Sequence, residues 1–211
     1  MWSRLSFVGP VVAAGIIFTV AARADDAARQ AIQKALKAQL EVPAYRIKSS
    51  CLDNVKLNTH DVITEVANPD KVHTVQKWNG SVNTEAFTDG KRLLTRDGGT
   101  GEFKEQTDDP AAKIKELRDN ALLGEPGKED DVRQNGQETT KGITASVYII
   151  TSKSLNSTTT LWIGDSDNRV LKTVRKIKGE LSILKQTTRV DMYCETTYEY
   201  DPTIKITLPG P

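Results

Sequence analysis

The sequence predicts an α+β fold in which a strongly curved antiparallel sheet of about 11 strands carries helices packed in or over its concave face. Short runs of β-branched and apolar residues are separated by Gly, Asp, Asn and Pro, a pattern typical of hairpins. Amphipathic helical patterns occur only over residues 25–40 and 110–123, so the strands are not separated by helices as in a parallel sheet. A sheet of that many strands must curl or close, and two helices are too few to cover both of its faces.

The N-terminus is typical of a secretory signal peptide. Arg4 supplies a positive charge, residues 5–22 are apolar and uncharged, and Ala22-Arg23-Ala24 is an A-x-A cleavage sequence. We therefore expect cleavage after Ala24, a single domain over residues 25–211, and a periplasmic protein with no integral membrane segment. The alternative is an uncut membrane anchor, which the length of the apolar run allows, although Pro10 interrupts it.

The charge balance argues against a nucleic-acid partner. The chain has 29 Lys and Arg against 28 Asp and Glu, for a formal net charge of +1, and the two signs are interspersed. Nucleic-acid-binding proteins present a concentrated basic surface, which this chain does not have. A strongly polarised membrane-binding face is not indicated either.

The two cysteines, Cys51 and Cys194, are predicted to form one disulfide. An even number of cysteines in an exported protein favours pairing, and this pair would join an early strand to a late one. The alternative is two separate free thiols.

The expected elements follow from the hydrophobic periodicity. The first helix, over residues 25–40, begins at Asp25 or Asp26 and ends before Pro43. Its predicted apolar stripe is Ala28, Ile32, Ala35, Leu36 and Leu40. The second helix starts at Pro110 and ends at Gly124. Strands are expected over residues 45–52, 60–67, 71–78, 81–88, 91–96, 102–106, 132–134, 142–152, 158–163, 169–174, 181–190, 193–200 and 203–208.

No group of residues forms a recognisable catalytic site, so we expect neither enzymatic activity nor a cofactor. The chain has no G-x-S-x-G sequence, phosphate-binding loop or dinucleotide-binding glycine pattern. His60 and His73 lack partners at ligand spacing, so no metal site is predicted. Residues 165–168 resemble the start of a calcium loop but lack its Gly and distal Glu, which favours a solvated hairpin turn.

Large apolar side chains are distributed over many of the predicted strands and the second helix. A concave sheet under helices is a plausible ligand cavity, and such side chains either line it or fill an ordinary core. The predicted cavity residues are Trp78, Phe87, Leu93, Phe103, Ile114, Leu117, Tyr148 and Trp162.

Four segments, in order, carry a resemblance to a known family. They are the helix and first strand of residues 25–52, Asn68-Pro69-Asp70-Lys71-Val72-His73, residues 88–94 with Asp89-Gly90-Lys91, and residues 161–172 with Leu161-Trp162-Ile163. Together they make the chain similar to the periplasmic lipoprotein-localisation superfamily, typified by the outer-membrane lipoprotein carrier. The resemblance covers most of residues 25–211.

The resemblance implies an unclosed antiparallel half-barrel whose helices form a lid over a hydrophobic cavity for acyl chains. It implies a non-enzymatic carrier or chaperone for a lipid or for lipoprotein acyl chains. The alternative is an envelope structural or signalling protein that uses the same fold to bind a protein partner. The carrier has an Arg before the Pro of residues 68–69, where this chain has Asn68, so the carrier's lid-locking contact is not carried over. We expect the helix of residues 110–123, flanked by Gly98–Gly101 and Gly124–Gly127, to be the lid.

Overall fold

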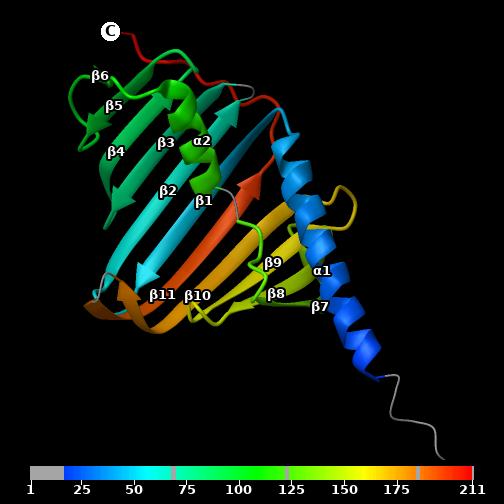
Figure 1. Cartoon of the computed structure of the whole chain (residues 1–211). Coiled ribbons are helices and arrows are strands. Elements are labelled where there is room, and N and C mark those ends of the chain that lie inside the picture. Colours follow the sequence, from blue (N-terminus) through cyan, green and yellow to red (C-terminus); the bar gives the residue numbers. More distant parts are fainter. Residues whose placement is uncertain (1–16, 68–69, 122–123, 184–185, 211) are drawn as a thin grey trace, which may run out of the picture.

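A single antiparallel sheet organises the chain. The computed structural model describes residues 17–67, 70–121, 124–183 and 186–210. Its 11 strands follow the order β6-β5-β4-β3-β2-β1-β11-β10-β9-β8-β7 (Figure 1). Two consecutive meanders, β1 to β6 and β7 to β11, are therefore joined where the first strand pairs with the last. The edge strands β6 and β7 are not paired with each other, so the predicted unclosed, curved α+β half-barrel is confirmed.

The strands vary from two to 14 residues in length. The first meander comprises β1 (Ala44–Asp53), β2 (Asn58–Ala67), β3 (Lys71–Trp78), β4 (Ser81–Thr88), β5 (Leu93–Asp97) and β6 (Lys104–Glu105). The second comprises β7 (Asp131–Thr140), β8 (Ile143–Ser152), β9 (Ser157–Gly164), β10 (Val170–Ile183) and β11 (Gln186–Glu199).

Two of the predicted turns are in the wrong place. The stretch 181–190, predicted as one strand, folds back on itself, because Ile183 pairs with Gln186 and Leu181 with Thr188. β7 continues through Asn135-Gly136, where the register shifts and Gly136 has a φ of +87°. The turn into β8 lies instead at Lys141-Gly142, where both residues adopt a positive φ.

The closing strand predicted over residues 203–208 is absent, and that segment is irregular. The physical reason is that β11 already has β1 on one side and β10 on the other, so no free edge remains beside it. The chain turns instead at Asp201, whose side chain accepts hydrogen bonds from the N–H and hydroxyl of Thr203.

The helix α1 (Ile17–Leu40) begins upstream of the predicted cap at Asp25. The sequence before Asp25 is rich in alanine, a strong helix former, so the helix does not need to start there. Gln39, rather than Leu40, completes the buried stripe of Ala28, Ile32 and Ala35, while Leu40 is 56% exposed. No described helix is long and apolar enough to cross a membrane.

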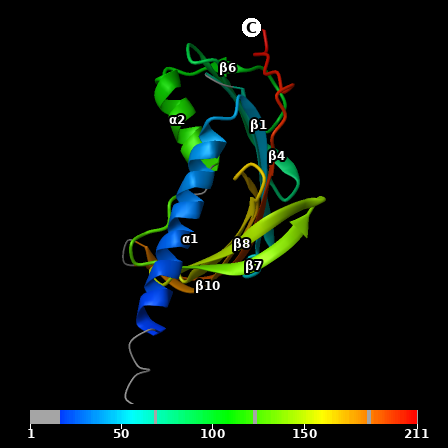
Figure 2. The same cartoon turned by 90° about the vertical axis from the view of Figure 1, so that its right-hand side faces the viewer.

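Both helices pack on the same face of the sheet (Figure 2). α1 covers the β7–β10 half, where Ile32 belongs to one buried cluster with Tyr148, Leu161 and Ile163. α2 (Pro110–Ala121) lies over the first meander, and its Ile114 belongs to the same cluster. Asp109 caps α2 through a hydrogen bond from the Ala111 N–H. The core therefore lies between the concave face and the two helices.

Candidate functional site: a cavity on the concave face

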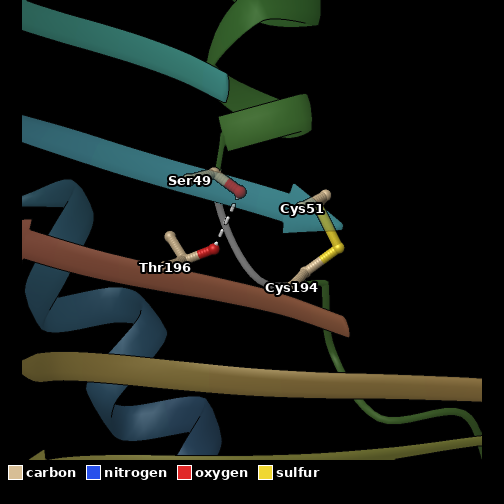
Figure 3. Close-up of a disulfide and its surroundings, with 4 residues drawn as sticks. All are labelled: Ser49, Cys51, Cys194 and Thr196. Carbon is tan, nitrogen blue, oxygen red and sulfur yellow. Dashed lines mark hydrogen bonds between the residues drawn. A yellow bond between two sulfur atoms is a disulfide. The ribbon is translucent and has the colours of Figure 1, made fainter. Parts of the chain in front are cut away.

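Cys51 of β1 and Cys194 of β11 form the predicted disulfide in the strand pair that joins the two meanders. Figure 3 shows it beside Ser49 and Thr196, whose hydroxyls are hydrogen-bonded at 3.1 Å. These four residues alternate with outward-facing neighbours, because successive side chains on a strand point to opposite faces. All four belong to the wall of one cavity on the concave face.

The cavity has a volume of about 640 Å³, within the range of small-molecule sites. Its floor is formed by strands β1–β5 and β9–β11, and Lys113 and Glu116 of α2 contribute to its cover. Threonine is the most frequent lining residue. The lining residues are Ile47, Ser49, Cys51, His60, Val62, Thr64, Thr74, Gln76, Thr84, Ala86, Leu93, Thr95, Gln106, Asp108, Lys113, Glu116, Thr159, Thr173, Arg175, Cys194, Thr196 and Tyr198.

The strand register arranges these side chains in rows across the sheet. One row, here called the polar row, runs from Arg175 of β10 through Cys194, Cys51 and His60 to Trp78 of β3. It lies at the sheet end where the β1–β2, β3–β4 and β8–β9 turns are found, here called the hairpin end.

The next row along the strands carries hydroxyl and amide groups. Thr173, Thr196, Ser49 and Gln76 lie in it, each two residues from the polar row on its own strand. Further from the hairpin end the wall becomes more buried and less polar, because Ile47, Tyr198 and Ala86 share one row with Thr64 and Thr74, and Leu93 lies beyond them. The cavity therefore changes along the strand direction from a polar end to a buried end of threonine and apolar residues.

Arg175 and His60, in the polar row, have polar atoms without partners. Arg175 is half-buried and, among the described residues, makes no ion pair or hydrogen bond. The Nε2 atom of His60 is buried without a hydrogen-bond partner, and its ring stacks on Trp78 at a centroid distance of 4.4 Å. Buried polar atoms in proteins are normally paired. These two side chains therefore offer unused hydrogen-bonding capacity to a bound molecule.

The other ionisable groups of the wall are paired, exposed or neutral. Lys113 donates to both carboxylate oxygens of Glu116, at 2.8 and 2.9 Å. Asp108, which also lines the cavity, is exposed in the segment between β6 and α2. Burial raises the pKa of Tyr198 to about 12, against the opposing effect of its hydrogen bond with Thr173, so the phenol is neutral.

Of the predicted cavity residues, Leu93 lines the cavity, whereas Trp78 does not and stacks on the lining residue His60. Ile114 and Tyr148 lie on the concave side in the buried core. The side chain of Leu117 lies outside the described part of the chain.

The structure does not bring Phe87, Phe103 and Trp162 to the cavity. Phe87 alternates with the cavity residue Ala86 and stacks on His73 on the convex face, where Phe103 meets it edge-on. Trp162 donates from Nε1 to Glu138 at 2.8 Å and lies near Lys172, also away from the cavity. Period-two alternation on β4 and β9 explains these positions, because Ala86 and Leu161 occupy the inner face.

A contact that the sequence did not predict ties α1 to the loop that leads from α2 to β7. Arg29 of α1 donates to the carbonyl oxygen of Gly127 at 2.9 Å and also to that of Asp130. The loop is closed further by the Gly127 N–H, which donates to the Asp130 carboxylate at 2.8 Å. The loop after α2 is therefore held by α1, at the place where glycines suggested a hinge.

The convex face of the same strands carries a chain of ion pairs. His73 contacts Glu65 and Glu85 through its two ring nitrogens, each at 3.0 Å. Arg46 donates to Glu65 at 2.7 Å, and Arg96 donates to Glu85 at 2.8 Å. Burial opposes ionisation of both glutamates, but hydrogen bonds from His73 and the arginines outweigh it and hold their pKa values below the usual range.

No metal centre is evident in the described residues, since no group of three or more His, Cys, Asp or Glu is placed to hold an ion.

The sequence signal for the observed cavity lining is the alternation of inward and outward side chains along each strand. Thr64, Thr74 and Thr84 sit at the inward positions of β2, β3 and β4. The prediction from the sequence rested on large apolar side chains and therefore missed these threonines, because threonine is equally common on exposed strand faces.

Comparison with known structures finds the same fold in two mycobacterial proteins. The lipoprotein LppX of Mycobacterium tuberculosis aligns with a TM-score of 0.56 and 13% identity, over 83% of this chain and 94% of that one. LprF of Mycobacterium bovis aligns with a TM-score of 0.54 and 14% identity, over 88% of this chain and 97% of that one. No protein-family model matches the sequence, and no curated protein matches it.

The similarity lies in the arrangement of strands and helices rather than in the residues, so it establishes the fold and leaves the ligand open. In this chain that arrangement is an unclosed antiparallel half-barrel with two helices on its concave face. The chain therefore shares its fold with LppX and LprF, and the half-barrel architecture that the sequence resemblance implied is confirmed.

Proposed function

We propose that this protein is an exported, non-enzymatic carrier or chaperone that holds a lipid or an acyl chain in the concave-face cavity. The observation that carries the proposal is a cavity of about 640 Å³ between the sheet and α2, polar at one end and buried and less polar at the other. An amphiphile has the same two-part character. Cleavage after Ala24 and release into the periplasm are part of the proposal.

Exposed apolar side chains at the hairpin end support uptake of the ligand from a lipid surface. Leu52, Leu57, Trp78 and Leu155 are between 39% and 79% exposed, and all lie at or next to the turns of that end. Exposed apolar groups gathered at one end of a sheet are typical of an interaction site. An envelope protein that docks there is the alternative function, and the same cluster favours it.

The test is native mass spectrometry of protein purified from its exported compartment, combined with organic extraction. Adjacent threonines on β11 provide matched variants, because Thr196 lines the cavity and Thr197 faces the other side. Thr196→Phe should remove the bound lipid mass by filling the cavity, whereas Thr197→Phe should retain it. A wild-type protein that carries no lipid but retains a protein partner would support the alternative.

The proposal includes α2 as a movable cover. The helix buries Ile114 and contributes Lys113 and Glu116 to the cavity wall. Among the described side chains of α2, Ile114 is the one buried large aliphatic, and its burial contributes about 1.5–3 kcal/mol, which is small enough to allow opening. Hydrogen exchange should be faster in α2 than in β10 without ligand and should slow when an acyl ligand is added. Equal protection that ligand leaves unchanged would make α2 a static part of the core.

A further inference from the structure

The polar row contains a positively charged side chain, Arg175, that has no partner within the described part of the protein. Arg175 lies on β10 with its side chain in the cavity wall, directly opposite Cys194 and Thr159 in the strand register. Most nearby arginines and lysines have a carboxylate partner, for example Lys172 with Glu195 at 2.9 Å. Arg175 has none among the described residues, although it is half-buried. A partly desolvated guanidinium is costly unless it is paired, so its natural partner is an anion that enters the cavity.

His60 supplies a second unused group in the same row. Its Nε2 atom is buried and has no partner, and stacking on Trp78 fixes the plane of the ring. Between Arg175 and His60 lie the two cysteines, whose disulfide offers no strong hydrogen-bond donor. The row therefore presents two polar groups on a rigid, covalently joined section of the sheet.

The polarity gradient fixes the orientation of a ligand. From Cys51 in the polar row to Ile47 in the apolar part is four residues along β1, or about 13 Å at strand spacing. Leu93 lies one row further from the hairpin end and is 1% exposed. A chain placed there would bury its apolar part near Leu93 and Ile47 and bring its headgroup to the polar row.

We propose that the cavity selects amphiphiles with an anionic headgroup, a phosphate or a carboxylate, which Arg175 binds and His60 positions. This inference rests on the proposed carrier function and adds a ligand class and an orientation to it. Glu116 does not oppose it, because Lys113 neutralises that carboxylate, and Asp108 is exposed to solvent, which screens its charge. A neutral amphiphile would leave the guanidinium unpaired and therefore binds less tightly.

The test compares dodecyl phosphate, 1-dodecanol and inorganic phosphate by titration calorimetry or displacement of a fluorescent fatty-acid probe. The wild type should bind dodecyl phosphate about tenfold or more tightly than dodecanol, since a charge-assisted hydrogen bond is lost with the alcohol. Arg175→Gln should weaken dodecyl phosphate binding about tenfold and leave dodecanol unchanged. His60→Phe, which keeps the stacking ring, should weaken it severalfold.

Two controls separate the possible outcomes. Lys176→Gln makes the same charge change at the next residue of β10, which is exposed and faces the opposite side, and it should bind as the wild type does. Arg175→Lys should restore part of the affinity lost in Arg175→Gln. All variants should show wild-type melting temperatures.

The results distinguish failure of the inference from failure of the carrier function. If the wild type binds dodecyl phosphate and dodecanol equally, or if Arg175→Gln binds both as before, the headgroup site is refuted while lipid binding stands. If neither amphiphile binds, the carrier function itself is refuted. Binding of inorganic phosphate as tight as that of dodecyl phosphate would also overturn the inference, because the apolar part of the cavity would then contribute nothing.

Discussion

The two faces of strands β1–β5 differ in how fully their polar side chains are paired. On the convex face, Glu65, His73 and Glu85 are linked to arginines at both ends in one chain of ion pairs. On the concave face, the polar residues pair only locally, as Thr64 does with Thr74, or not at all, as with the Nε2 atom of His60. The same strands therefore carry one face whose half-buried charges are paired within the protein and one with a buried polar atom that is not.

This difference predicts that the residues important for stability and those important for ligand binding lie on opposite faces. A polar group whose partners are all within the protein contributes to the free energy of folding, whereas an unpaired one lowers it until a ligand arrives. Substitutions on the convex face should therefore change stability and leave ligand binding intact. Substitutions of Arg175 and His60 should do the reverse, whereas the disulfide, which lies in the same row and joins the two halves of the sheet, should dominate the stability of both.

The largest effect is expected from loss of the disulfide. Cys51 and Cys194 are 143 residues apart in sequence, and closing a loop of that size stabilises a protein by about 5 kcal/mol in the chain-entropy model. The variant with both cysteines replaced by serine should show a correspondingly lower midpoint of urea unfolding. Adding a reductant should lower the midpoint of the wild type and not that of the variant; an equal response in both would contradict the prediction.

A smaller loss is expected from the convex face. Glu85 is 13% exposed and accepts hydrogen bonds from Arg96 and His73, so Glu85→Gln should cost about 1–3 kcal/mol, and less if solvent screens the pairs. Glu116→Gln, at an exposed helical pair, should cost about 0.5 kcal/mol or less. Chemical denaturation measures both changes. If Glu85→Gln binds dodecyl phosphate as the wild type does, the convex face contributes to stability and not to ligand binding.

The pH dependence should come from the same face. The pKa values of Glu65 and Glu85 are lowered in the folded protein, so these groups bind fewer protons folded than unfolded. Their stabilisation is complete above the unfolded value of about 4.5 and is lost as the pH falls through the lowered folded values. Urea unfolding between pH 3 and pH 7 should show this loss below about pH 4.5, and less of it in Glu85→Gln. An acid loss of equal size in that variant would argue against the assignment.

A small effect on stability is also expected from the cavity threonines. Thr64 and Thr74 are 3% exposed, and their hydroxyls contact each other at 3.4 Å. Replacing both by valine removes donor and acceptor together, so the free energy of unfolding should change by about 1 kcal/mol or less. The single Thr74→Val variant should be less stable than the double variant. Denaturation of the three proteins measures the difference, and additive losses would mean that the hydroxyls are not coupled.

Most of the fold was predictable because local patterns determine it. The alternation in residues 71–78 and 81–88 predicted β3 and β4 at their observed limits. The errors arose where long-range pairing decides the outcome. Thr203–Leu208 has a strand-like composition, but β1 and β10 already occupy both edges of β11. The Asn135-Gly136 pair resembles a hairpin turn, yet it forms a bulge within β7.

The location of the cavity was predictable from the sequence, but most of its lining residues were not. The sequence indicated a cavity under the helices, and it identified Leu93 in the wall. It did not indicate which face Phe87 and Trp162 occupy, because that depends on strand register across the whole sheet. The row that contains Arg175 and His60 joins β10 to β2 through the β1–β11 pair. No local pattern brings residues 115 positions apart into one row.

The pairing of the first strand with the last also determines how the molecule responds to a protease. Every peptide bond between Cys51 and Cys194 lies inside a covalent ring closed by the disulfide. A single cut at an exposed turn, such as the one at Leu57 or Leu155, opens this ring and releases no fragment. The two pieces stay linked, and most of the strand pairs still hold them in place. In an oxidising compartment the oxidised protein can thus be nicked and remain one molecule, which separates into two chains only after reduction.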